Sequence, residues 1–163
     1  RFFKWALDSE KEHSVSVLRK VLLFKGLNKK LSRKLLIDLI EKEYKPGEII
    51  FSEGDSGKAL YVILSGSVRI VKKINSGQKI LANLGPGSYF GELALINQLP
   101  RFASAVADAE SNLLIMYKSY FDNLIKGNSA ISSQVLFNLA ESLSYYICRN
   151  ENMLNDNADK TES

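Results

Sequence analysis

In the first part of the chain, apolar residues recur every three or four positions, which predicts helices. Gly26 can end a first helix, and Asn28 can cap the start of a second one. On this pattern the chain is helical up to about Tyr44. The apolar positions are Val17, Leu18, Val21 and Leu22 in the first helix, and Leu31, Leu35, Leu36, Leu39 and Ile40 in the second.

From about residue 45 to 117 the pattern changes to short apolar runs separated by turn residues. The turn signals include Pro46-Gly47, Ser65-Gly66, Asn75-Ser76-Gly77 and "GPG" at 85–87. Short strands at such intervals predict an antiparallel sandwich, barrel or jelly roll. The predicted strands lie in "EIIFSEGDSG", "ALYVIL", "SVRIVKKI", "QKILANL", "ASAVADAE" and "NLLIMY".

After about residue 118 the pattern is helical again. "KSYFDNLIKGN" predicts a short helix that Gly127 ends, and "SAISSQVLFNLAESLSYYICRNENML" predicts a longer one. The polar tail over 155–163 is expected to be disordered. We therefore expect a helical extension over 1–19 and one domain over 20–154, whose β part lies at about 45–117 and whose C-terminal helices lie at about 118–154.

Composition excludes several classes of protein. A chain of 163 residues suits one domain. It holds no apolar run of 18 residues and no signal peptide, so we expect no membrane span and a cytoplasmic location. The single cysteine, Cys148, excludes an internal disulfide and fits a reducing compartment. With one histidine, His13, the chain lacks the ligands of a Zn or Fe–S site, and no nucleophile–base arrangement stands out, so we expect neither a metal nor an enzyme.

The net charge of +4 is mild. Basic residues cluster at Lys29, Lys30, Arg33 and Lys34, where they could contact nucleic acid or anionic lipid. A solvated helix face is the better interpretation, because the polar face of a helix needs charge in any case. The residues after 154 offer no second pair of helices joined by a turn, so we expect no direct nucleic-acid binding by this chain.

The stretch "FGELALINQLPRFASAV" at 90–106 combines one acid, Glu92, and one base, Arg101, with small or apolar residues. "GELALI" predicts a short helix, whose first amides attract an anion, and Gly91 allows a ligand to approach the backbone closely. Arg101 can bind an anionic oxygen, and Glu92 can accept a hydrogen bond from a hydroxyl. These residues predict a pocket for a small phosphate that also carries a hydroxyl. The alternative is a Glu92–Arg101 ion pair across a surface loop.

The same stretch resembles the phosphate-binding cassette of cyclic nucleotide-binding domains. These domains occur in the regulatory subunits of cAMP-dependent protein kinase, in the catabolite activator protein and in cyclic nucleotide-gated channels. The resemblance covers about residues 20–150, with Gly54, Tyr61 and Gly66 at the family's glycine and aromatic positions. The matching blocks are "LLFKGLNKKLSRKLL", "YKPGEIIFSEGDSGKALYVILSGSVRI" and "ILANLGPGSYFGELALI".

The resemblance implies an α+β fold, in which an antiparallel β jelly roll (β-roll) is flanked by N-terminal helices and a long C-terminal helix. It implies a regulatory domain that binds cAMP or cGMP and signals through that helix. Arg101 matches the arginine that binds the cyclic phosphate, and Glu92 matches the glutamate that accepts the ribose 2′-hydroxyl. Gly91, Leu93, Ala94, Phe102 and Ala103 complete the expected ligand-binding set, with backbone amides near Ala94, Phe102 and Ala103 facing the phosphate oxygens.

Phe102 departs from the family pattern, in which Ala, Ser or Thr follows the arginine. A threonine there is typical of cGMP-selective members, so a phenylalanine, without a hydroxyl, favours cAMP. If the ring points into the barrel or stacks on the purine, binding survives. If the ring fills the pocket, the domain is degenerate and Arg101 pairs with Glu92 instead.

The C-terminal helix has two predicted roles. Residues 131–154 are expected to form a homodimer, through a seam of Leu136, Leu139, Leu143, Tyr146, Asn150 and Met153, and the alternative is that this stripe packs on its own domain. Tyr145 and Tyr146 are candidates for a lid over the base, although both fit a seam or a surface equally well. Two other functions remain open: a ligand-independent dimerisation or interaction module, and the sensor part of a transcription regulator without its DNA-binding domain.

Overall fold

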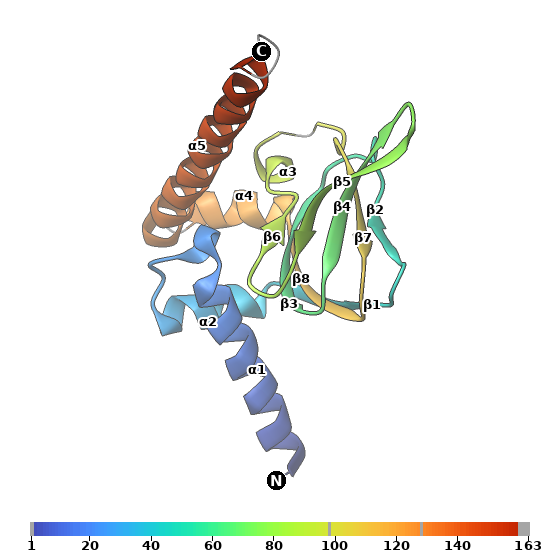
Figure 1. Ribbon diagram of the computed structural model, residues 1–163. Helices are drawn as coiled ribbons and strands as arrows, with labels where there is room; N and C mark the ends of the chain where they lie inside the picture. The colour runs from blue at the N-terminus through green and yellow to red at the C-terminus, as the bar shows by residue number, and fades with distance from the viewer. Residues whose placement is uncertain (1, 98, 128, 160–163) are drawn as a thin grey trace.

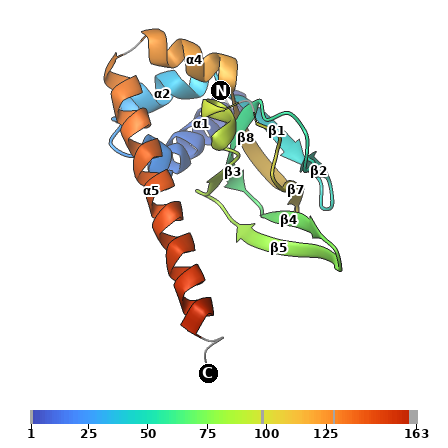
Figure 2. The same ribbon diagram turned by 90° about the horizontal axis from the view of Figure 1, so that it is seen from above.

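Helices gather on one side of a two-sheet β structure in the computed structural model of the chain (Figures 1 and 2). The residues described are 2–97, 99–127 and 129–159, with side chains described for 9–97, 99–127 and 130–148. This α+β arrangement confirms the predicted fold class. No helix in these ranges is long and apolar enough to cross a membrane.

The N-terminal segment consists of α1 (Phe2–Lys20), the 3-10 turn η1 (Leu22–Phe24) and α2 (Lys29–Ile37). Asn28 caps α2 as predicted, because its side chain accepts a hydrogen bond from the Leu31 amide at 2.9 Å. α1 itself ends at Lys20, before the stop predicted at Gly26, and the 3-10 turn η1 lies between them.

The β part is built from two four-stranded antiparallel sheets. The first sheet has the strand order β1 (Ile40–Tyr44), β8 (Ser111–Tyr117), β3 (Ala59–Ser65) and β6 (Tyr89–Phe90). The second has the order β2 (Ile49–Phe51), β7 (Ser104–Ala107), β4 (Val68–Ile74) and β5 (Gly77–Leu84). These eight strands form the predicted jelly roll.

Strand β1 corrects the prediction that the chain is helical up to Tyr44. Residues 40–44 pair one by one with β8, from Ile40 opposite Ile115 to Tyr44 opposite Ser111. The sequence "IEKEY" contains good helix formers, but pairing of all five β1 residues with β8 outweighs this weak local preference. The β part therefore begins at Ile40, before the predicted boundary at about residue 45.

The C-terminal part consists of α3 (Leu93–Ile96) within the cassette, α4 (Lys118–Gly127) and α5 (Ser129–Asp159). α5 extends beyond the body of the molecule (Figure 1) and continues into the tail that was expected to be disordered from residue 155. Residues 160–163 of that tail lie outside the described residues.

Two apolar clusters hold these parts together. One joins the helices to the first sheet through buried residues such as Leu18, Phe24, Leu60 and Leu139. The other lies between the two sheets. Leu139 is only 2% exposed and packs in the chain's own core, so its predicted place in a dimer seam is wrong.

Candidate nucleotide-binding site

Backbone hydrogen bonds to the turn at 52–57 fix the position of Arg101. The Arg101 amide donates to the Asp55 carbonyl at 2.7 Å, and the Gly54 amide donates to the Arg101 carbonyl at 2.8 Å. The turn itself is held by the Asp55 carboxylate, which accepts a hydrogen bond from the Ser52 amide at 2.8 Å. The turn at 52–57 thus positions the arginine.

The Arg101 side chain is buried, with 8% of its surface exposed. Its Nη2 donates to the Ala59 carbonyl at 2.7 Å, and its Nη1 donates to the Gly91 carbonyl at 3.2 Å. Burial lowers the pKa of the guanidinium, and the nearby Tyr61, Glu92 and Asp55 oppose that change. The group stays a cation, because the unperturbed pKa of arginine lies far above neutrality.

Three aromatic rings form a wall beside this cation. The Arg101 Cζ lies 4.0 Å from the ring centroid of Phe51 and 5.8 Å from that of Tyr61. Tyr61 stacks on Phe90 with centroids 5.2 Å apart, and Phe51 lies 5.9 Å from Phe90. The faces of such rings attract a cation. The wall also excludes water, which strengthens the polar contacts of the site.

One buried nitrogen of the guanidinium has no hydrogen-bond partner among the described residues. Arg101 Nε is buried and makes no hydrogen bond to any described residue. An unsatisfied buried donor is costly, and it is costlier on a charged group. The cation is therefore only partly satisfied by the protein, which is the condition under which an anionic oxygen binds well.

Position 91 requires glycine for two reasons, its backbone conformation and the atoms packed around it. Its φ is +80°, a conformation that favours glycine. A Cβ at this position would lie 2.6 Å from Arg101 Nη1 and 3.1 Å from the Ala59 carbonyl oxygen. A larger residue would therefore push the guanidinium out of its place.

Glu92 lies at the N-terminus of α3 and is half-buried. Burial raises the pKa of its carboxyl above the usual 4.5, while its own backbone amide and Arg101 act in the opposite direction. Both residues are described, and no ion pair joins them. The alternative of a simple Glu92–Arg101 ion pair is therefore wrong, and the carboxylate is left to accept other hydrogen bonds.

The neighbouring cassette residues differ in exposure. Leu93 is 47% exposed, whereas Ala94 and Ala103 are buried. The Ala94 amide donates to the Gly91 carbonyl at 3.2 Å and so closes the single turn of α3. Among the described residues, no hydrogen bond engages the amides of Phe102 and Ala103, and these stay the predicted phosphate donors.

The Phe102 ring lies outside the barrel, with 62% of the residue exposed. Lys72 holds it there: its Nζ donates to the Phe102 carbonyl at 2.7 Å and lies 4.6 Å from the ring centroid. The ring therefore does not fill the interior. Lys72 was not identified from the sequence, since a lysine on a strand carries no signal of such a contact.

The two lid candidates lie on α5. Tyr145 is 63% exposed and Tyr146 is 43% exposed, and their rings meet edge to face with centroids 6.4 Å apart. Their role over a base stays a prediction. Phe51 and the Ala59 carbonyl were missed, the first because it reads as an ordinary strand residue and the second because a carbonyl leaves no mark in a sequence.

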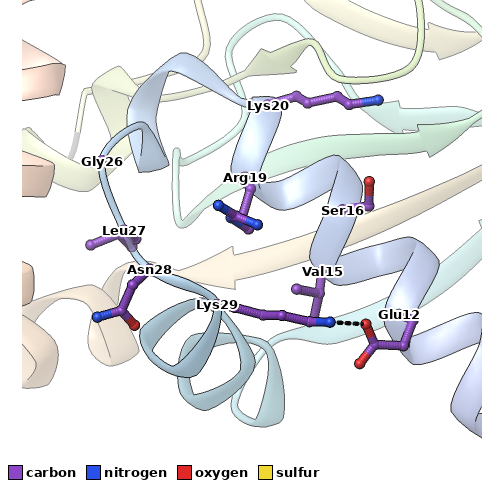
Figure 3. Close-up of a pocket in the computed structure, with 9 residues that line it drawn as sticks. All are labelled: Glu12, Val15, Ser16, Arg19, Lys20, Gly26, Leu27, Asn28 and Lys29. Carbon is purple, nitrogen blue, oxygen red and sulfur yellow. Dashed lines mark ion pairs between the residues drawn. The ribbon is translucent and has the colours of Figure 1, made fainter.

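A separate cavity of about 600 Å³ lies between α1 and the start of α2 (Figure 3). Lys29 spans one side of it and pairs with Glu12 at 2.7 Å, and none of the cassette residues contributes to its lining. The cavity is therefore distinct from the predicted site. In the described part of the chain, no group of three His, Cys, Asp or Glu residues could hold a metal ion.

Comparisons with known proteins show the family to which the chain belongs. Residues 41–128 match the family model of the cyclic nucleotide-binding domain. The cyclic AMP receptor protein of Thermus thermophilus is 39% identical over 101 residues, which cover 61% of this chain and 47% of that protein. A regulatory subunit of cAMP-dependent protein kinase from Yarrowia lipolytica is 34% identical over 108 residues, covering 66% of this chain and 28% of that protein.

Solved structures show the same fold. The regulatory domain of Toxoplasma gondii PKA, crystallised with cAMP, superposes with a TM-score of 0.65 at 30% identity, over 70% of this chain and 44% of that one. The chain spans less than half the length of the two curated relatives described above. The match to the family model covers more than half of the chain. The chain therefore belongs to the cyclic nucleotide-binding domain family.

Proposed function

We propose that this domain binds cAMP in preference to cGMP and passes its occupancy to an attached module or partner through α5. One observation carries the proposal: a buried arginine, Arg101, with an unsatisfied Nε, held beside Gly91 and an aromatic wall. A negatively charged phosphate would supply the partner that the buried cation lacks. This role is regulatory binding, not catalysis.

Each cassette residue has a proposed part. Arg101 binds the exocyclic phosphate oxygens, and the amides of Phe102 and Ala103 add neutral donors to the same group. Glu92 accepts the ribose 2′-hydroxyl, a role open to it because it is not paired with Arg101. The glycine at 91 keeps the backbone close enough for both contacts.

The preference for cAMP rests on Phe102. Its side chain has no hydroxyl that could reach the amino group of guanine, and the ring lies outside the barrel, held by Lys72. The names of the two curated relatives also refer to cAMP. We expect Phe102→Thr to reduce the difference in affinity between cAMP and cGMP, while Phe102→Ala should keep the preference for cAMP.

Isothermal titration with cAMP and cGMP tests the proposal. Arg101→Ala should weaken cAMP binding by about 2–5 kcal/mol, roughly 30- to 5000-fold, because the phosphate loses its buried partner. Arg101→Lys keeps the charge and guards against loss of folding, and it should bind more weakly than the parent because it lacks the fork of donors. Arg33→Ala removes an exposed arginine of α2 and serves as the control.

Two results would reject the proposal. The first is parent-like affinity in Arg101→Ala. The second is the absence of binding of either nucleotide by the parent, which would favour a degenerate domain that acts only through its surface.

We propose a second role, homodimerisation, for residues 131–154 of α5. The observation that favours it is an exposed apolar face, with Leu136 43%, Phe137 67% and Ile147 60% exposed. Leu143 packs against the chain's own core, as the alternative interpretation of the stripe had it. The side chains of Asn150 and Met153, assigned to the seam, lie outside the described residues.

A further inference from the structure

Strand β6 carries two consecutive aromatic residues that serve different parts of the molecule. Phe90 belongs to the aromatic wall next to Arg101. Tyr89 packs against the helical cluster, and its hydroxyl lies 2.5 Å from Ser142 Oγ on α5. Neighbouring residues of a strand point to opposite faces, so a shift of β6 moves both contacts together.

α5 is held at a second point one turn earlier. Asn138 is 2% exposed, and its Nδ2 donates to the carbonyls of Leu23 at 3.0 Å and Lys25 at 2.8 Å. Asn138 and Ser142 are four residues apart and so share one face of the helix. The first anchors α5 to the N-terminal segment, and the second anchors it to the strand that enters the cassette.

Beyond Leu143 the helix leaves the body of the molecule. Ser142 is 4% exposed, whereas residues 144–148 are all exposed. Figures 1 and 2 show this end of α5 projecting away from the sheets. A change at Ser142 therefore acts at the root of the projecting part.

We propose that the Tyr89–Ser142 hydrogen bond couples the cassette to α5, with both residues as positioning residues. This inference deepens, and rests on, the proposed function. Because Ser142 is 4% exposed, a stretched bond would leave its buried hydroxyl without the Tyr89 partner. On this proposal the contact is either made or replaced by an arrangement that exposes the Ser142 hydroxyl, so that α5 has two discrete positions.

A purely structural bond would support stability without linking the two elements. Tyr89→Phe removes the hydroxyl and keeps the ring, and Ser142→Ala removes the other partner. Tyr120→Phe is the matched control, since Tyr120 packs against the same cluster from α4. Ser144→Ala controls for a serine lost from an exposed site on the same helix.

Hydrogen exchange of the full chain without nucleotide gives the first test. We expect Tyr89→Phe to speed exchange across residues 143–148, and Ser142→Ala to speed exchange across residues 89–94, each by about three- to tenfold. Both controls should leave these segments at the parent's rates. Effects confined to the element that carries the substitution would overturn the proposal.

The single cysteine allows an independent measurement of the mobility of α5. Cys148 is exposed, so a nitroxide attached there reports the mobility of α5. The label should become more mobile in Tyr89→Phe than in Tyr120→Phe. Equal spectra in these two variants would count against the coupling.

Saturating cAMP gives the third test and separates the two proposals. In the parent and in Tyr120→Phe, the nucleotide should change exchange across residues 143–148, and in Tyr89→Phe this change should be lost. An equal change in all three proteins overturns the coupling and leaves nucleotide binding intact. A parent that binds no nucleotide overturns the proposed function, while the nucleotide-free exchange still decides whether β6 and α5 are coupled.

Discussion

Gly91→Ala tests whether the cassette backbone and the guanidinium of Arg101 form one unit. The added methyl group has two effects that the structure separates. Its backbone must hold a φ of +80°, and its Cβ would lie 2.6 Å from Arg101 Nη1. The second effect cannot be absorbed by an ordinary van der Waals adjustment, because the Ala59 carbonyl is also within 3.1 Å of the new atom.

The magnitudes can be added. The left-handed conformation costs an alanine about 1–2 kcal/mol. Displacing the guanidinium removes at least one buried, charge-assisted hydrogen bond, for a further loss of about 1.5–3 kcal/mol. The sum is about 2.5–5 kcal/mol, and each kcal/mol corresponds to about 2–4 °C in Tm for a chain of this size.

Gly87→Ala is the matched control. Its φ of +84° is nearly the same, and nothing lies within 4 Å of the Cβ that would be added. It should therefore lose only the conformational part, about 1–2 kcal/mol. Urea denaturation measures the stability of both variants, and titration with cAMP measures their affinity.

We expect Gly91→Ala to be the less stable of the two and to bind cAMP at least tenfold more weakly than Gly87→Ala. Equal stability losses together with equal affinities would refute the reasoning. Such a result would mean that the guanidinium moves freely within the site and that its two carbonyl contacts do not position it.

Three further predictions follow from burial and charge. Burial raises the pKa of the Glu92 carboxyl above 4.5, so above pH 4.5 the folded state binds more protons at this group than the unfolded state, and the group lowers the stability of the fold as the pH rises. Glu92→Gln should therefore be more stable than the parent at neutral pH. Urea denaturation at stepped pH should show this advantage disappearing below pH 4.5. Leu139→Ala, at a residue 2% exposed, should lose about 2–5 kcal/mol of unfolding free energy, and Leu136→Ala, at 43% exposed, much less. Sedimentation should show a dimer that Phe137→Glu dissociates, because Phe137 is 67% exposed on the proposed face and a buried charge opposes association; a monomeric parent at micromolar concentration would reject the dimer.

Local signals in the sequence predicted most of the fold. The cap at Asn28 and the turn at Pro46-Gly47 depend on the residues next to them, and the structure has both where the pattern placed them. Strand β1 was missed because its cause is remote: Ile40 pairs with Ile115, far along the chain. A short segment rich in Glu and Lys carries no local mark of that pairing.

In the candidate site, too, local features could be predicted and features set by remote contacts could not. The residue types of Gly91, Glu92 and Arg101 were enough to predict a phosphate pocket. The orientation of Phe102 was not predictable, because it depends on Lys72, thirty positions earlier in the chain. The contacts that hold Arg101 could not be predicted either, since they are made to backbone carbonyls. The same is true of its buried Nε, which has no partner among the described residues.

Four consecutive residues join the site to the rest of the molecule. Tyr89 contacts α5, Phe90 forms part of the aromatic wall, Gly91 accepts a hydrogen bond from Arg101, and Glu92 lies beside them with a carboxyl pKa raised by burial. Burial also lowers the pKa of the Arg101 guanidinium, so the folded site holds a cation that its surroundings only partly stabilise. An anion that relieves this cost stabilises the folded state by the free energy of its binding. Because the segment at 89–92 is short and bonded on both sides, the proposed coupling predicts that this stabilisation acts at the cassette and at the root of α5 together.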